Sequence, residues 1–107
     1  MEEVRTNGFT AKDMFNSAVA LPLKNAVGQV LNVTDVWVCE RPDVDGNIQT
    51  VANIKTEDGS IYGTISDTVV RSVLALPEML VENGVVAIKP EFRPGSHGRE
   101  YLIITLA

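Results

Sequence analysis

The chain of 107 residues contains only one cysteine, one histidine and one tryptophan. The single cysteine, Cys39, excludes an internal disulfide bond and any zinc site built mainly from cysteines. No apolar run approaches the roughly 18 residues that a membrane helix needs, and the acidic, polar N-terminus lacks the features of a secretory signal. We therefore expect no membrane association, no metal and no other cofactor, and a reducing compartment.

Positive charge is also scarce, with nine Lys and Arg against 14 Asp and Glu and a net charge of −5. This balance argues against binding to nucleic acid by electrostatic attraction alone. Residues 84–107 nevertheless carry +1 from Lys89, Arg93 and Arg99 against two glutamates, which leaves −6 on residues 1–83. Apolar residues make up 45% of the chain, so overall disorder is excluded and one domain over residues 1–107 is expected.

Alternating apolar residues and turn residues predict five strands, at residues 29–39, 48–56, 60–66, 85–92 and 99–106. Helical spacing from Val69 to Leu74 follows the third strand, and Pro77 is expected to open a second helical turn that ends at Asn83-Gly84. Residues 1–20 are predicted to be a short N-terminal extension, with a loose beginning and a helical turn near residues 11–17.

The resulting β-β-β-α-β-β order is that of an OB-fold, a mostly β, five-stranded Greek-key barrel. Other small α+β sheets share this order. In the first strand Leu31 and Val33 have one parity and Val36 and Val38 the other, which predicts a bulge or sharp bend between the pairs. Small barrels need such a bend to close.

The third strand alternates in a way that predicts which side chains share a face. Ile61, Gly63 and Ile65 have one parity and are expected to face the core. Tyr62 would then lie on the outer face of the sheet, near Lys55 of the partner strand. An equally good explanation is that Tyr62 is half-buried and supports the sheet.

Catalytic motifs are absent from the sequence. His97 lies in a glycine-rich loop and Cys39 at a strand end, and neither belongs to a nucleophile motif. No phosphate-binding P-loop or GxGxxG pattern occurs, and the paired carboxylates fall in turns, where turn chemistry explains them. We therefore expect that the protein is not an enzyme.

Single-stranded nucleic acid is bound by rings that stack on bases and by cations along the phosphates, and stacking does not need a basic protein. The candidate stacking residues are Tyr62, Trp37, Phe92 and Tyr101. The candidate phosphate contacts are Lys55, Arg93 and Arg99, with Lys89, Arg41 and His97 as further members of the site. Each of these candidate binding residues also has a purely structural explanation. For example, a lone tryptophan often lies in the core, and arginines are common at solvated hairpin tips.

The segment from Asp58 to Tyr62, followed by Ile65-Ser66 and the helix from Val69, resembles the single-stranded DNA-binding proteins of small Bacillus phages that replicate linear genomes by protein priming. The segments 14–18, 23–25 and 96–106 also resemble this family, so the similarity extends over residues 14–106 with scattered identities. Tyr62 matches one of the family's stacking tyrosines. The family has further rings near the end of the first strand and in the next loop, where this chain has only Trp37.

The resemblance implies a viral protein that coats and protects single-stranded DNA during phage DNA replication, without strong sequence preference. Its partners would be single-stranded DNA and, by extension, the viral DNA polymerase or other replication proteins. It would act in the host cytoplasm as a monomer or homodimer. Two alternatives remain open: a protein-binding module that uses the acidic face of residues 35–58, and a structural component of a virion.

Overall fold

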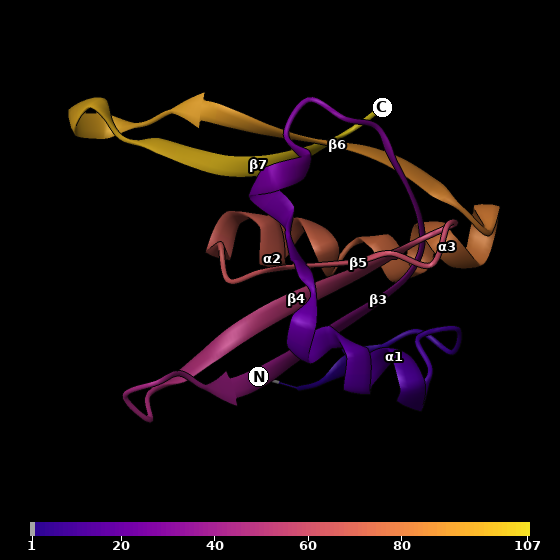
Figure 1. The fold of residues 1–107 in the computed structure, drawn as a ribbon. Coiled ribbons are helices and arrows are strands. Elements are labelled where there is room, and N and C mark those ends of the chain that lie inside the picture. Colours follow the sequence, from indigo (N-terminus) through magenta and orange to yellow (C-terminus); the bar gives the residue numbers. More distant parts are fainter. Residues whose placement is uncertain (1) are drawn as a thin grey trace.

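The structure, a computed structural model, describes residues 2–107 and shows a mostly β protein with one curled sheet (Figure 1). The sheet contains seven strands, namely β1 (Val4–Arg5), β2 (Leu21–Pro22), β3 (Leu31–Pro42), β4 (Ile48–Thr56), β5 (Ile61–Thr64), β6 (Val86–Pro94) and β7 (Glu100–Leu106). The α-helices are α1 (Ala11–Asn16), α2 (Asp67–Val73) and α3 (Leu76–Asn83), and short 3₁₀ turns are η1 (Ser17–Val19), η2 (Leu23–Ala26) and η3 (Ser96–Gly98).

Strand β3 joins the two halves of the sheet. Its first residues, 31–33, pair antiparallel with β6, and residues 35–42 pair antiparallel with β4. The register shifts between Val33 and Asp35, so Thr34 forms the bulge that the parity change predicts. The bulge keeps Val33 and Val36 on the same buried face although their spacing is odd.

The β4–β5 hairpin turns at Gly59, whose φ of 86° is easily adopted only by glycine. Helices α2 and α3 follow and lie between the β3–β5 part of the sheet and the β6–β7 hairpin (Figure 1). Pro77 lies in the first turn of α3, as predicted, and Gly84 ends the helix. The buried faces of these elements form the main core, which includes Val36, Ile54, Val69, Val73 and Ile88.

A second, smaller core lies on the other face of the sheet. Phe9 is fully buried there and packs against Trp37, with ring centroids 5.8 Å apart, and Cys39 and Ile61 complete the cluster. The cover is the N-terminal segment, by which we mean residues 2–26. The prediction of a loose beginning is therefore wrong, because β1 pairs with β3 and Phe9 anchors the chain.

Helix α1 confirms the predicted helical turn and begins with a capping box. Thr10 caps the backbone N–H of Asp13, and the Asp13 carboxylate accepts from the backbone N–H of Thr10 at 2.8 Å. Lys55 of β4 forms an ion pair with the same carboxylate at 2.8 Å. Burial raises the pKa of Asp13, but the hydrogen bonds from Lys55 and Thr10 outweigh it and leave this pKa below its ordinary value.

The predicted five strands correspond to β3–β7, but the prediction missed the two-residue strands β1 and β2. Strand β2 pairs in parallel with the free side of β5, and within residues 2–107 β5 does not pair with β7. The sheet is therefore curled but not closed by hydrogen bonds. None of the helices in this described part of the chain is long and apolar enough to cross a membrane.

Candidate nucleic-acid interface

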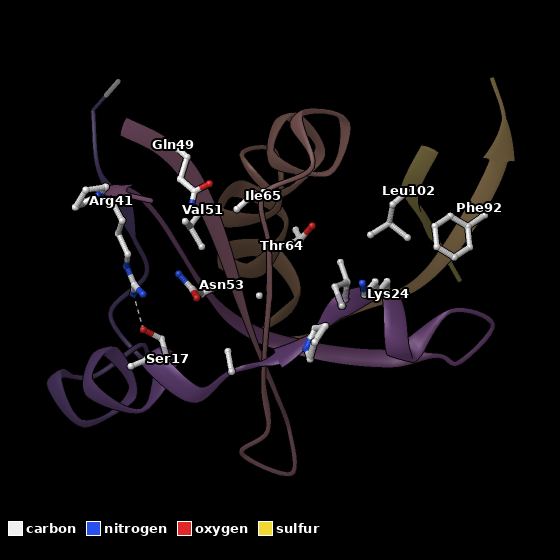
Figure 2. Close-up of a pocket in the computed structure, with 16 residues that line it drawn as sticks. Ser17, Lys24, Arg41, Gln49, Val51, Asn53, Thr64, Ile65, Phe92 and Leu102 are labelled. Atoms are coloured by element: carbon white, nitrogen blue, oxygen red, sulfur yellow. Dashed lines mark hydrogen bonds between the residues drawn. The ribbon is translucent and has the colours of Figure 1, made fainter. Parts of the chain in front are cut away.

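A groove of about 600 Å³ lies over β4 and β5, on the face of these strands that carries Asn53 and Gly63. Leu23 and Leu102 of the main core also line it. It is bounded by the N-terminal segment on one side and by the β6–β7 hairpin on the other (Figure 2). Its lining comes from parts of residues 17–24, from residues 63–65, from Phe92 and Leu102 of the hairpin, and from β3 and β4 through Arg41, Pro42, Gln49, Val51 and Asn53. The groove therefore exists only when segments from across the chain are assembled.

The charge in the groove differs from that of the chain as a whole. Lys24 and Arg41 line the groove, and no carboxylate does. All 14 acidic residues of the chain thus lie outside its lining. On a protein with a net charge of −5, this local arrangement makes the groove the favourable place for an anionic ligand.

Arg41 is held in place by two contacts. Its guanidinium donates a hydrogen bond to Ser17 Oγ at 2.6 Å (Figure 2). It also lies 5.0 Å from the centroid of the Trp37 ring. Ser17 in turn donates to the backbone carbonyl of Met14. This positioning reduces the entropy that the side chain would lose on binding a phosphate.

Phe92 supplies the one aromatic ring of the lining. Its side chain is 43% exposed, and in Figure 2 it lies beside Leu102 at the end of the groove opposite to Arg41. The apolar side chains of Val51 and Ile65 line the wall between these two ends. A ring at one end, cations and an apolar wall are the features that hold an unpaired nucleotide.

The structure corrects the predicted orientation of Tyr62. In the β4–β5 register Tyr62 is opposite Ile54, a fully buried residue of the main core, and its ring packs against that core. Ile61, Gly63 and Ile65 share a face as predicted, but it is the face of the groove and the second core. Tyr62 therefore lies on the opposite face of β5 from the groove.

Two more predicted residues have structural contacts. Trp37 is buried beneath the N-terminal segment, which leaves its ring no exposed face for stacking on a base. Lys55 uses its ammonium group for the ion pair with Asp13 and for a hydrogen bond to the Gly8 carbonyl at 3.2 Å. Both residues thus hold the N-terminal segment on the sheet.

The predicted residues of the β6–β7 hairpin do not form one cluster with Phe92. Phe92 is paired with Leu102 in the groove, whereas Arg93 is paired with Tyr101 at the next position and points to the other face of this two-stranded ribbon. Arg99 precedes β7 at the exposed tip of the hairpin.

Glu91 neutralises part of the positive charge of the hairpin. It pairs with Arg93 at 3.1 Å and with Lys89 at 3.9 Å. His97 lies at the exposed tip of the hairpin with a φ of 58°. Of the ten predicted residues, the structure places only Arg41 and Phe92 in the groove.

Lys24 and Asn53 also line the groove, although the sequence patterns did not predict them as site residues. Lys24 is the only charged residue between Met14 and Thr34, which is a signal for a cation placed against an apolar surface. Asn53 lies between Ala52 and Ile54 in a strand. Asparagine is disfavoured in strands, so its presence there suggests that its amide forms a specific hydrogen bond.

Cys39 is a free and buried thiol. Burial raises the pKa of the Cys39 thiol more than the nearby Arg41 guanidinium lowers it, so the thiol is a poor nucleophile. Within residues 2–107, no group of three or more His, Cys, Asp or Glu side chains is placed to hold a metal ion.

Comparisons with models of protein families, with curated proteins and with solved structures give no match for this chain.

Proposed function

We propose that this protein binds single-stranded DNA in the groove over β4 and β5, without strong sequence preference and without catalysis. The observation that carries this proposal is the combination of Lys24, Arg41 and Phe92 in a groove that no carboxylate lines. The cations would contact phosphates and Phe92 would stack on a base. Each stacked base contributes about 1–3 kcal/mol to such complexes.

The position of the groove supports an OB-fold as the underlying architecture. Strands β3, β4 and β5, then helices, then β6 and β7 follow the order of that fold, and β3 pairs with both β4 and β6. OB-folds bind oligonucleotides on the face of their second and third strands, between the loop that joins the first two strands and the loop that joins the last two. Here the groove lies on β4 and β5, between residues 41–49 and the β6–β7 hairpin.

The resemblance of the segment from Asp58 to Tyr62 to phage single-stranded DNA-binding proteins supports the biological part of the proposal. The protein would coat displaced strands during viral DNA replication in the host cytoplasm and would meet the viral polymerase there. In the form proposed here, Tyr62 supports the sheet, and stacking is assigned to Phe92. Tyr101, Arg93 and Arg99 would contact nucleotides that extend beyond the groove.

The test is a titration of the protein with oligo(dT), followed by the fluorescence of Trp37, which touches Arg41 at the edge of the groove. We expect saturable binding, and an affinity about 5- to 150-fold lower for Phe92→Ala, the equivalent of one lost stack. Phe15→Ala is the matched control, because Phe15 is 82% exposed and does not line the groove. Equal affinities of the two variants would remove Phe92 from the site.

The cations are tested by the salt dependence of binding. Two phosphate contacts predict a slope of roughly −1.4 in a plot of log affinity against log salt, since each contact on a single strand contributes about −0.7. Lys24→Gln should make the slope shallower by about 0.7, whereas Lys12→Gln, an exposed lysine outside the groove, should leave it unchanged. No binding at low salt would refute the proposed function and favour the protein-binding alternative.

A further inference from the structure

Asn53 presents an unused hydrogen-bond acceptor to the groove. The residue is 1% exposed, and its Nδ2 donates to the backbone carbonyl of Trp37 at 3.1 Å. Because a carbonyl can only accept, this bond fixes the amide with its Oδ1 away from Trp37. Within residues 2–107, Oδ1 has no hydrogen-bond partner, and Asn53 lines the groove. Among residues 2–107, Trp37 Nε1 is the unpaired side-chain atom that is fully enclosed, whereas Asn53 Oδ1 remains open to the groove. A ligand with a donor can therefore take the place of the water that bonds to Oδ1 in the free protein.

Gly63 keeps the space in front of this acceptor open. It is opposite Asn53 in the β4–β5 register, and a Cβ atom at position 63 would lie 3.6 Å from Asn53 Oδ1 and 3.5 Å from Ala20 Cβ. Its φ is not among the positive ones of the chain, so the backbone does not require glycine here. The absence of a side chain at position 63 therefore leaves open the space in front of Asn53 Oδ1.

The other polar side chains around Asn53 can donate hydrogen bonds. Gln49 adds an amide that can donate, and Lys24 and Arg41 are donors only. Asn53 Oδ1 is thus an acceptor of fixed orientation in a groove that also holds the donors of Lys24 and Arg41 and the amide of Gln49, which can donate or accept.

We propose that Asn53 recognises the imide edge of one unpaired thymine or uracil base by accepting a hydrogen bond from its N3–H. This edge has one donor flanked by two carbonyl acceptors, so its N3–H can donate to Oδ1 while a carbonyl accepts from the amide of Gln49. The inference rests on the proposed function, since it assumes that the groove holds single-stranded nucleic acid. It adds a preference for one class of base to binding that is otherwise indifferent to sequence.

The experiment compares oligo(dT) with an oligonucleotide of the same length in which every thymine is methylated at N3. Methylation removes the donor and keeps the ring for stacking. We expect the affinity to fall about 5- to 150-fold, the fold-change for a buried acceptor left unpaired. Oligo(dU), which lacks the 5-methyl group but keeps N3–H, should bind like oligo(dT).

The protein side is tested with Gly63→Ala, which places a methyl group beside Oδ1 without backbone strain. This variant should bind oligo(dT) no better than the original protein binds the methylated strand, and methylation should then have no further effect. Equal binding of methylated and unmethylated strands by the original protein would overturn the role of Asn53 and leave the proposed function intact. A Gly63→Ala protein that keeps the full methylation effect would also overturn it. Failure of both strands to bind would instead refute the proposed function.

Discussion

Replacing Phe9 by alanine would test whether the N-terminal segment is part of the folded unit. Phe9 is fully buried, and its ring packs on Trp37 at 5.8 Å between centroids, at a tilt of 42°. Few other apolar side chains of this segment reach the second core, where Met14 and Ala20 are only partly buried. The loss of the ring would leave a cavity that this thin cover cannot fill by small movements.

The expected cost is about 3–5 kcal/mol, the range for removing a phenylalanine from a core. Because a domain is stable by only about 5–15 kcal/mol, this is a large fraction of the total. For a chain of this size, the melting temperature should fall by roughly 15 °C or more, at about 4–8 °C per kcal/mol.

The assay is urea unfolding followed by the emission of Trp37, the only tryptophan and the neighbour of the mutated ring. In the native state of the variant, this emission should also shift to longer wavelength as water reaches the indole. Phe15→Ala is the control, since its exposed ring should change stability by no more than about 0.5 kcal/mol. A cost below about 1 kcal/mol for Phe9→Ala would refute the reasoning and show that the segment is not coupled to the fold.

Three further predictions concern a carboxylate, a glycine and the thiol. Asp13→Asn should lower the free energy of unfolding by about 1 kcal/mol at pH 7. Because the pKa of Asp13 is lower in the folded protein, its carboxylate stabilises the fold above pH about 4, and this contribution is lost as the pH falls further. Urea melts should therefore show a smaller stability difference between the original protein and the variant at pH 3 than at pH 7. An equal difference at the two pH values would contradict this prediction. Gly59→Ala should cost about 1–2 kcal/mol in a thermal melt because its φ is 86°, whereas a cost near zero would exclude strain at this turn. Cys39 is buried and the pKa of its thiol is raised, so it should react with a thiol reagent only as fast as the protein opens. Urea at concentrations below the midpoint of unfolding should therefore accelerate the labelling. Immediate labelling in buffer without urea would show that the thiol is accessible in the folded protein.

Local features of the fold were predictable from the sequence. The parity change between Val33 and Val36 located the bulge, and Asp58-Gly59 located the β4–β5 turn. Strand β4 was predicted with the bounds that the structure shows. These features depend on neighbouring residues, so a local pattern is sufficient to reveal them.

The orientation of Tyr62 was not predictable in the same way. A period of two residues shows which side chains share a face, but not which face is buried. In β5 both faces are covered, one by the main core and the other by the N-terminal segment. Ile61 is buried on the second face, and the sequence alone gave no reason to expect a second core.

The groove was the least predictable feature, because its residues meet only through the tertiary arrangement. Phe92 and Arg41 were expected to bind nucleotides, but Asn53 and Lys24 were not. Asn53 is defined as an acceptor only by its bond to the Trp37 carbonyl, which depends on the pairing of β3 with β4. No spacing along the chain encodes that bond.

The double pairing of β3 also determines when, during protein synthesis, the chain can acquire its binding surface. β3 and β4 are joined by a short loop, but Val33 also pairs with Val86, which is 53 residues later. Contacts this distant in the chain make folding slow, on the order of milliseconds to seconds. On the ribosome the β3–β4–β5 meander can form while β6 has not yet been translated, whereas the groove also needs Phe92 and Leu102. A nascent chain would therefore complete the groove only after its last strand had emerged.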